Sequence, residues 1–158
     1  GHHAVLGGLA RVDALAVLDA ENLLARCREM GEYFLQSLKP FPQKYDLVKA
    51  VRGKGLLIGI EFGQPDSFML RQAWTVMHKI NPGLFAQAFT IPLLQKHAVL
   101  TQVAGSNQDV LKIAPSFVVT REDADWGVRA LDEVLESAHK FPGPFWEIAK
   151  SLAKNALL

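Results

Sequence analysis

Few residues of this sequence have the type and spacing that catalysis requires. Cys27 is the single cysteine. It falls on the apolar stripe expected for the first helix, which favours a small buried hydrophobic residue over a nucleophile paired with a histidine. His78, His97 and His139 have no other histidine, cysteine or carboxylate at a spacing typical of metal ligands. We therefore expect these histidines at helix ends or on the surface, and no metal site is predicted.

The most informative segment is 51–61, in which Gly53-Lys54-Gly55 separates an extended run from a run of Leu and Ile. Glycine-rich loops that bind phosphate follow a strand and open a helix, and this segment opens no helix. A tight turn between two strands explains both glycines. Arg52 and Glu61 are then either an ion pair across the hairpin or two solvated side chains. The segment offers a basic turn and no active site.

Helical and extended patterns surround this segment. Apolar residues three and four positions apart indicate helices, whereas short runs bounded by turn residues indicate strands. Thr120 is the expected N-cap of the clearest helix, and Ser67 or Asp66 caps the helix after the hairpin. Pro92 is expected to kink its helix or to begin the last turns. The expected helices are 9–38 with a kink or break near 19–22, 67–80, 84–97, 121–140 and 145–156; the expected strands are 47–51, 56–62, 99–103 and 110–113.

These elements predict an α+β fold. The short connection at 52–55 favours an antiparallel hairpin, because parallel neighbours need a longer crossover. A small, mostly antiparallel sheet of about four strands covered by helices satisfies the order of the elements, within the broader α/β class. Residues 4–158 are long enough to form one domain with its own core. Residues 1–3 are interpreted as the remnant of a purification tag.

Composition excludes several classes of function. The 158 residues include 17 basic and 16 acidic residues, well interspersed, with a net charge of +1. No basic stripe indicates nucleic-acid binding, and no apolar run approaches the roughly 20 residues that span a bilayer. Hydrophobic residues make up 49% and charged residues 21%, which is ordinary for a globular domain. A single cysteine suits a reducing compartment, so a cytoplasmic protein is expected.

Further motifs follow one another in a recognisable order. The segments Asp13–Leu18, Glu21–Leu24 and Gly31–Tyr33 precede Val51-Arg52-Gly53-Lys54-Gly55-Leu56 and Gly59-Ile60-Glu61; Val99-Leu100-Thr101, Val110–Pro115 and a helix start at 120–125 come after them. In this order, over most of residues 9–140, they resemble the C-terminal small domain of class III, pyridoxal-phosphate-dependent aminotransferases. These enzymes are of fold type I and include the ornithine and acetylornithine aminotransferases.

The resemblance implies that the intact enzyme uses pyridoxal 5'-phosphate, held as a Schiff base by a lysine of a large domain preceding residue 1. None of the ten lysines here lies in such a context. We therefore expect no catalytic residue in this chain, no cofactor bound to it and no activity on its own. The resemblance implies two substrate-binding residues: Arg52, near the domain interface, and Lys112, where acetylornithine-type enzymes carry an arginine that pairs with a substrate carboxylate. Lysine lacks the bidentate fork of arginine, and Lys112 as a structural strand residue is the open alternative.

The expected function of the intact enzyme is transfer of an amino group between an amino donor and a 2-oxo acid by a ping-pong route. Its partners would be its own large domain, the second subunit of a homodimer and a small amino-acid or amine substrate, with no nucleic acid and no membrane. The family's phosphate-contacting threonine has no counterpart in residues 4–8. Without its large domain the chain would expose apolar surface and self-associate, as a dimer. The alternative is a non-catalytic binding or dimerisation module with an antiparallel sheet.

Overall fold

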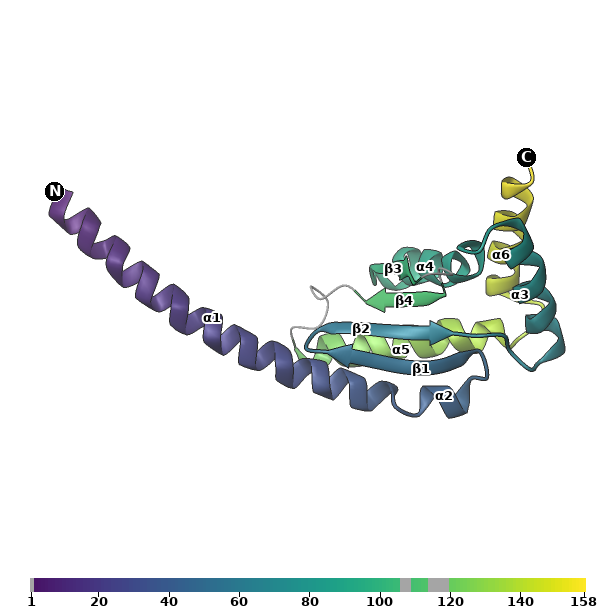
Figure 1. Ribbon diagram of the computed structural model, residues 1–158, viewed down its shortest axis with the longest axis horizontal. Coiled ribbons are helices and arrows are strands. Elements are labelled where there is room, and N and C mark those ends of the chain that lie inside the picture. The colour runs from purple at the N-terminus through teal and green to yellow at the C-terminus, as the bar shows by residue number, and fades with distance from the viewer. Residues whose placement is uncertain (1, 106–108, 114–119) are drawn as a thin grey trace.

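A computed structural model describes residues 2–105, 109–113 and 120–158, with side chains from Ala20 onward (Figure 1). The elements follow the predicted order, with one short additional helix, α2. They are α1 (His2–Leu38), α2 (Phe41–Lys44), β1 (Val48–Lys54), β2 (Leu57–Phe62), α3 (Phe68–Ile80), α4 (Leu84–His97), β3 (Thr101–Ala104), β4 (Val110–Ile113), α5 (Arg121–Ala138) and α6 (Pro144–Ala156). Residues 106–108 of one expected turn and the Ala114-Pro115 pair lie outside the described residues.

The four strands form one antiparallel sheet in the order β1-β2-β4-β3. One face is apolar: Ile58 and Ile60 of β2 are 2% and 0% exposed, and Leu111 and Ile113 of β4 are 1% and 2% exposed. Because side chains alternate along a strand, the residues between them point to the other face, where they are exposed or half-buried. Helices α4 and α5 lie on one side of the sheet in Figure 1. The predicted α+β fold with a four-stranded antiparallel sheet is confirmed. Within the described residues the helices leave one face of the sheet open.

Four phenylalanines from three helices form the centre of the core. Phe34 of α1, Phe85 and Phe89 of α4 and Phe145 of α6 are each 0–1% exposed. Ring centroids lie 5.4 Å apart for Phe85 and Phe89, and 4.8 Å apart for Phe89 and Phe145. Burying a side chain of this size contributes roughly 1.5–3 kcal/mol. These contacts join α6 to the same core as the helices that cover the sheet.

Helix α1 is continuous, so of the kink or break expected near 19–22 the break is wrong. Met30 is 6% exposed and marks the start of the part that enters the core, whereas Leu23 and Leu24 are 57% and 64% exposed. Cys27 lies between them and is half-buried, not fully buried as predicted. In Figure 1 the N-terminal part of α1 projects beyond the domain.

The hairpin turn is shorter than predicted. Strand β1 continues through Arg52 and Gly53 to Lys54, which pairs with Leu57, so Gly55 and Leu56 alone form the turn. Gly55 has φ 59°, the left-handed conformation that glycine adopts without strain. The connection predicted at 52–55 therefore begins three residues too early. Strand pairing continues up to Gly55, the residue of the turn whose φ is positive.

The expected N-cap of the helix that begins at residue 121 is confirmed. The Thr120 hydroxyl accepts a hydrogen bond from the Asp123 N–H at 3.1 Å, as an N-cap does. Helix α4 contains Pro92 and continues past it to His97. Helix α1 begins at His2, seven residues before the predicted start at 9, and the remaining bounds differ by a turn or less.

The start of α3 is capped differently from the prediction. Ser67 occupies the N-cap position, but its side chain makes no capping hydrogen bond. The carboxylate of Asp46 accepts hydrogen bonds from the backbone N–H groups of Asp66 and Ser67 at 2.8 and 2.9 Å, and lies 3.0 Å from His139 Nε2. Burial opposes ionisation of Asp46, but these hydrogen bonds outweigh it and lower its pKa. One carboxylate thus joins the starts of β1 and α3 to the end of α5.

Candidate functional site

The open face of the sheet brings the two predicted site residues together. Arg52 on β1 pairs with Gly59 on β2, and Gly59 pairs with Lys112 on β4, so the three form one row across the strands. Two strand spacings place the Cα atoms of Arg52 and Lys112 about 10 Å apart. An open hollow of about 360 Å³ lies over this row, and both side chains line it. The sequence indicated each residue separately, and the strand order joins them.

Gly59 keeps the hollow open between the two cations. A Cβ at this position would lie 3.3 Å from Val110 Cγ1, so any larger side chain would occupy the space over the row. Leu57, two residues earlier on the same face, is 61% exposed. The hollow is therefore apolar along part of its wall and cationic at its two sides.

Arg52 is held by a carboxylate on the neighbouring strand. Its Nη2 lies 2.8 Å from Oε2 of Glu61, with the side chains 77% and 41% exposed. Of the two arrangements that the sequence left open, the ion pair is the one formed. At such exposure an ion pair contributes about 0–1 kcal/mol to stability. Glu61 therefore orients the guanidinium and partly neutralises it, with little effect on the fold.

Lys112 is exposed on β4, and within residues 20–105, 109–113 and 120–158 no carboxylate lies within ion-pair distance of its amine. The residues that line the hollow are Arg52, Gly53, Lys54, Leu57, Ile58, Gly59, Val110 and Lys112. They include three cations but no histidine, cysteine, serine or carboxylate. The hollow can thus bind an anionic group such as a carboxylate. Its two lysines, Lys54 and Lys112, are exposed to solvent and lack the desolvated surroundings that activate an amine as a nucleophile or base.

The hairpin that carries Arg52 lies directly on α1. A Cβ at Gly31 of α1 would lie 1.8 Å from the carbonyl oxygen of Gly55, and a Cβ at Gly53 would lie 3.0 Å from Leu35 Cδ1. Real Cβ contacts are not that short at backbone atoms, so Gly31 permits the helix and the turn to touch. The two glycines flanking Lys54 thus have different roles, since Gly53 packs against the helix and Gly55 forms the turn.

None of the lysine side chains suits a Schiff base with pyridoxal phosphate. All ten lysines lie within the described residues, and every one is exposed to solvent. A lysine that forms such a Schiff base is desolvated in a pocket beside the cofactor ring. The residues of this chain therefore do not fit covalent attachment of the cofactor.

Two other site types can be assessed in the described part of the chain. There, no group of three or more His, Cys, Asp and Glu side chains is arranged to hold a metal ion. No helix in that part combines the length and apolar character needed to cross a bilayer.

Sequence analysis missed three histidine–carboxylate pairs, one of which places His97 Nε2 3.2 Å from Glu133 Oε2. His78 Nε2 lies 2.7 Å from Asp109 Oδ1, and His139 Nε2 lies 3.0 Å from Asp46 Oδ1. In both of these rings Nδ1 faces the carbonyl oxygen four residues earlier. Each ring therefore has an oxygen beside both of its nitrogens. The last two pairs join helices to other elements, and no local pattern shows them because the partners are 31 and 93 positions apart.

The chain was compared with protein families, with curated proteins and with solved structures. The family described as "Aminotransferase class-III" matches residues 6–135. Ornithine aminotransferase of Bordetella pertussis is 32% identical over 130 residues, which cover 82% of this chain and 26% of that protein. Alanine/serine racemase of Pyrococcus horikoshii is 31% identical over 131 residues, covering 80% and 23%. A transaminase solved with L-alanine has a TM-score of 0.59 and 28% identity, covering 81% of this chain and 27% of that chain.

The match includes the whole row across the sheet. Residues 6–135 contain Arg52, Gly59 and Lys112, together with the hairpin and most of α5, and leave α6 outside. The chain spans about a quarter of the length of the curated relatives that it matches. Since the matched residues make up most of its own length, the chain belongs to the class III aminotransferase family.

Proposed function

We propose that this chain is the C-terminal small domain of a pyridoxal-phosphate-dependent aminotransferase, which moves an amino group between an amino donor and a 2-oxo acid. The family match and the transaminase relatives support the reaction class. The observation that carries the proposal is the open sheet face, whose hollow is lined by cations, and whose lysines are solvated and not activated for proton transfer or covalent catalysis. Such a face can form one side of an active site and bind an anionic group of the substrate there, while the reactive groups belong to another domain.

The chain's own part in the reaction is then binding, orientation and exclusion of water. Pyridoxal phosphate, when bound, supplies the electron sink for the amino substrate. Its lysine is proposed to belong to a large domain, because the ten lysines here are all exposed. The apolar wall at Leu57 and Val110 is proposed to close against that domain and remove water from the substrate.

Lys112 is the proposed contact for the substrate carboxylate. It lines the hollow and, among the described residues, has no ion-pair partner of its own. Arg52 is proposed to lie at the domain interface, oriented by Glu61 at 2.8 Å. Amino acids and 2-oxo acids share a carboxylate, so one cationic row would serve both donor and acceptor. A lysine acts there as a point charge, without the paired hydrogen bonds of arginine.

The proposed partners are the large domain of the same enzyme, which would cover the open sheet face, and the second subunit of a homodimer. The single cysteine favours a reducing compartment, and the cytoplasm is the proposed location. The proposed substrates are small amino acids or amines with their oxo counterparts.

A second candidate reaction is racemisation of an amino acid. It is favoured by the relative named as an alanine/serine racemase, which is 31% identical over 80% of this chain. A carboxylate contact at Lys112 would serve either reaction, since both take an amino acid as substrate. The non-catalytic module remains a proposal of a different class.

The test is an assay of the chain as part of an enzyme with a class III large domain. Lys112→Ala should raise the KM for the amino acid by about 10- to 100-fold, because a charge-assisted contact to the carboxylate is lost. Lys112→Arg should restore binding, and Lys79→Ala, an exposed lysine of α3, serves as the control. An unchanged KM would remove Lys112 from the site. Racemisation without amino transfer would select the second candidate, and neither activity would support the non-catalytic module.

A further inference from the structure

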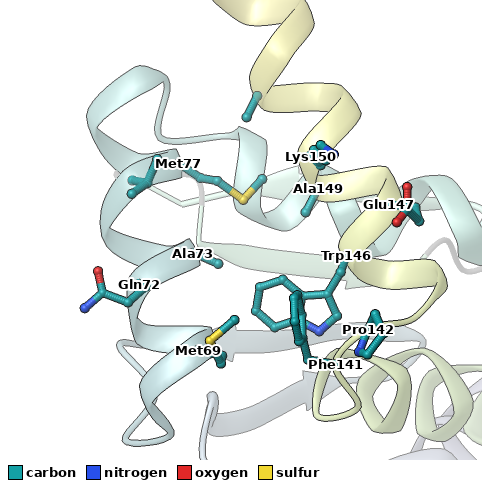
Figure 2. A pocket seen from close by; sticks show the side chains of 12 residues that line it. Met69, Gln72, Ala73, Met77, Phe141, Pro142, Trp146, Glu147, Ala149 and Lys150 are labelled. Atoms are coloured by element: carbon teal, nitrogen blue, oxygen red, sulfur yellow. The ribbon is translucent and has the colours of Figure 1, made fainter.

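A second hollow, of about 380 Å³, lies between α3 and α6 (Figure 2). Met77 of α3 and Ala149 of α6 line it and are 3% and 5% exposed, so the hollow reaches the core. Val76 lines its outer part and is 50% exposed. In Figure 1 the two helices lie at the end of the domain away from the projecting N-terminus of α1. This hollow shares no lining residue with the hollow over the cationic row.

The size and lining of this hollow suit a small molecule. Pockets that bind small molecules have volumes of about 300–1,000 Å³ and mostly apolar walls with a few polar groups. Here the charged and amide side chains are those of Gln72, Glu147 and Lys150, all exposed, and the other lining residues are apolar apart from the indole N–H of Trp146. A volume of 380 Å³ equals that of a cube about 7 Å on a side, whereas an α-helix with its side chains is about 10–12 Å across. A small molecule therefore fits the hollow, and a helix cannot enter it.

Trp146 places a hydrogen-bond donor in the wall of the hollow. Its Nε1 is buried, and the part of the chain that the structure describes supplies no acceptor for it. A neighbouring side chain is that of Phe141, whose ring centroid lies 5.2 Å from that of Trp146 with the ring planes at 85° (Figure 2). A buried indole N–H usually has a partner, because a buried donor left without one loses its hydration with no compensation. The wall thus favours an occupant that carries an acceptor.

Phe141 packs against the indole but lies largely in solvent. It is 61% exposed, and exposed side chains change rotamer within picoseconds to nanoseconds. A turn of Phe141 away from Trp146 therefore costs little packing and gives a molecule in the hollow access to the edge of the indole. Neither of the buried residues Met77 and Ala149 has to move for this to happen.

We propose that this hollow binds a neutral small molecule that has an apolar body and one carbonyl oxygen. The body packs between α3 and α6, and the carbonyl accepts a hydrogen bond from Nε1 of Trp146 once Phe141 has turned aside. A charged group at that depth would lose its hydration without gaining an opposite charge, since Glu147 and Lys150 are exposed at the rim. Because α6 lies outside the family match at 6–135, this binding does not rest on the proposed enzymatic function.

Propiophenone and propylbenzene are the probes that test the proposal, because they differ only by a carbonyl in place of a methylene. Titration of each into the isotopically labelled chain, followed by heteronuclear NMR, gives its dissociation constant and shows which residues it touches. Both should shift resonances of residues that line the hollow, and propiophenone should also shift the indole N–H resonance of Trp146. The three tryptophans give three indole resonances, and that of Trp146 is the one lost in Trp146→Phe.

Trp146→Phe should weaken the binding of propiophenone about five- to tenfold, because one hydrogen bond is lost, and should change that of propylbenzene less than about twofold. Trp126→Phe is the matched control and should change neither, since the Trp126 N–H donates to the carbonyl oxygen of His97 at 2.8 Å and lies outside the hollow.

Ala73→Leu fills the hollow and should abolish the binding of both probes. Far-UV circular dichroism checks that each variant is folded. The proposal would be overturned if the parent chain showed no saturable binding of propiophenone, if Trp146→Phe weakened both probes equally, or if Ala73→Leu still bound them. A dimer of the chain that excludes both probes would assign the hollow to a second copy instead.

Discussion

Replacing Gly31 by alanine should destabilise the domain, although alanine is the better helix former. In an exposed helix interior the exchange would stabilise by about 0.8–1 kcal/mol. Gly31 is buried on α1, and a Cβ there would lie 1.8 Å from the carbonyl oxygen of Gly55 and 2.5 Å from its carbon. Ordinary contacts begin near 3.4 Å, so the helix and the turn must separate by about 1.6 Å.

Neither clashing atom belongs to a flexible side chain, so the hairpin tip must move as a unit. Overpacking of this kind costs typically about 1–3 kcal/mol, and a backbone-to-backbone contact favours the upper end. After the gain in helix propensity is subtracted, the free energy of unfolding should fall by about 2 kcal/mol. The same displacement would shift Arg52 relative to Lys112.

Urea unfolding followed by far-UV circular dichroism measures this loss as a lower midpoint with an unchanged slope. Glu32→Ala is the control, because Glu32 is the next residue of the same helix and is exposed. Its effect should stay within about 0.5 kcal/mol. A Gly31→Ala variant more stable than the parent chain would refute the direct contact between α1 and the hairpin.

Three further predictions concern individual hydrogen bonds. Burial opposes ionisation of Asp46, but the hydrogen bonds to its carboxylate lower its pKa in the folded chain. The ionised carboxylate therefore stabilises the fold at pH values above its ordinary pKa of 3.8, and this stabilisation is lost as the pH falls through the lower folded pKa. Asp46→Asn should reduce that acid dependence in urea unfolding, and an unchanged profile would exclude this carboxylate as its source. Thr120→Ala should cost about 1 kcal/mol through the lost cap, measured by the same unfolding assay; no loss would contradict the capping role. Tyr45 donates its hydroxyl to Asp132, so Tyr45→Phe should lower stability by roughly 1–3 kcal/mol, and an unchanged midpoint would count against that bond.

Much of the fold could be predicted because local signals determine it. The Thr120 cap, the prolines after α1 and the positive φ of Gly55 each act within a few residues of the element that they bound. The apolar stripe of α1 did not predict which of its residues are buried. It showed that Leu23 and Leu24 share an apolar face, but a stripe does not reveal whether a partner covers it, and both are more than half exposed.

The arrangement of the candidate site could not be read from the sequence. Arg52 and Lys112 meet in one row only because β2 lies between β1 and β4, and strand order is not a local property. The same holds for the cap of α3, since Asp46 lies 20 positions before Asp66. Ser67 was the better local candidate, and tertiary contact replaced it.

We propose that this chain supplies a cationic binding face and no amine to hold the cofactor. Incubation with pyridoxal 5'-phosphate, followed by borohydride reduction and mass spectrometry of the peptides, tests it most directly. We expect weak labelling spread over several of the ten exposed lysines, with no saturable product of one cofactor per chain and no conversion of a 2-oxo acid. Stoichiometric labelling of a single lysine, together with amino transfer by the purified chain alone, would contradict it.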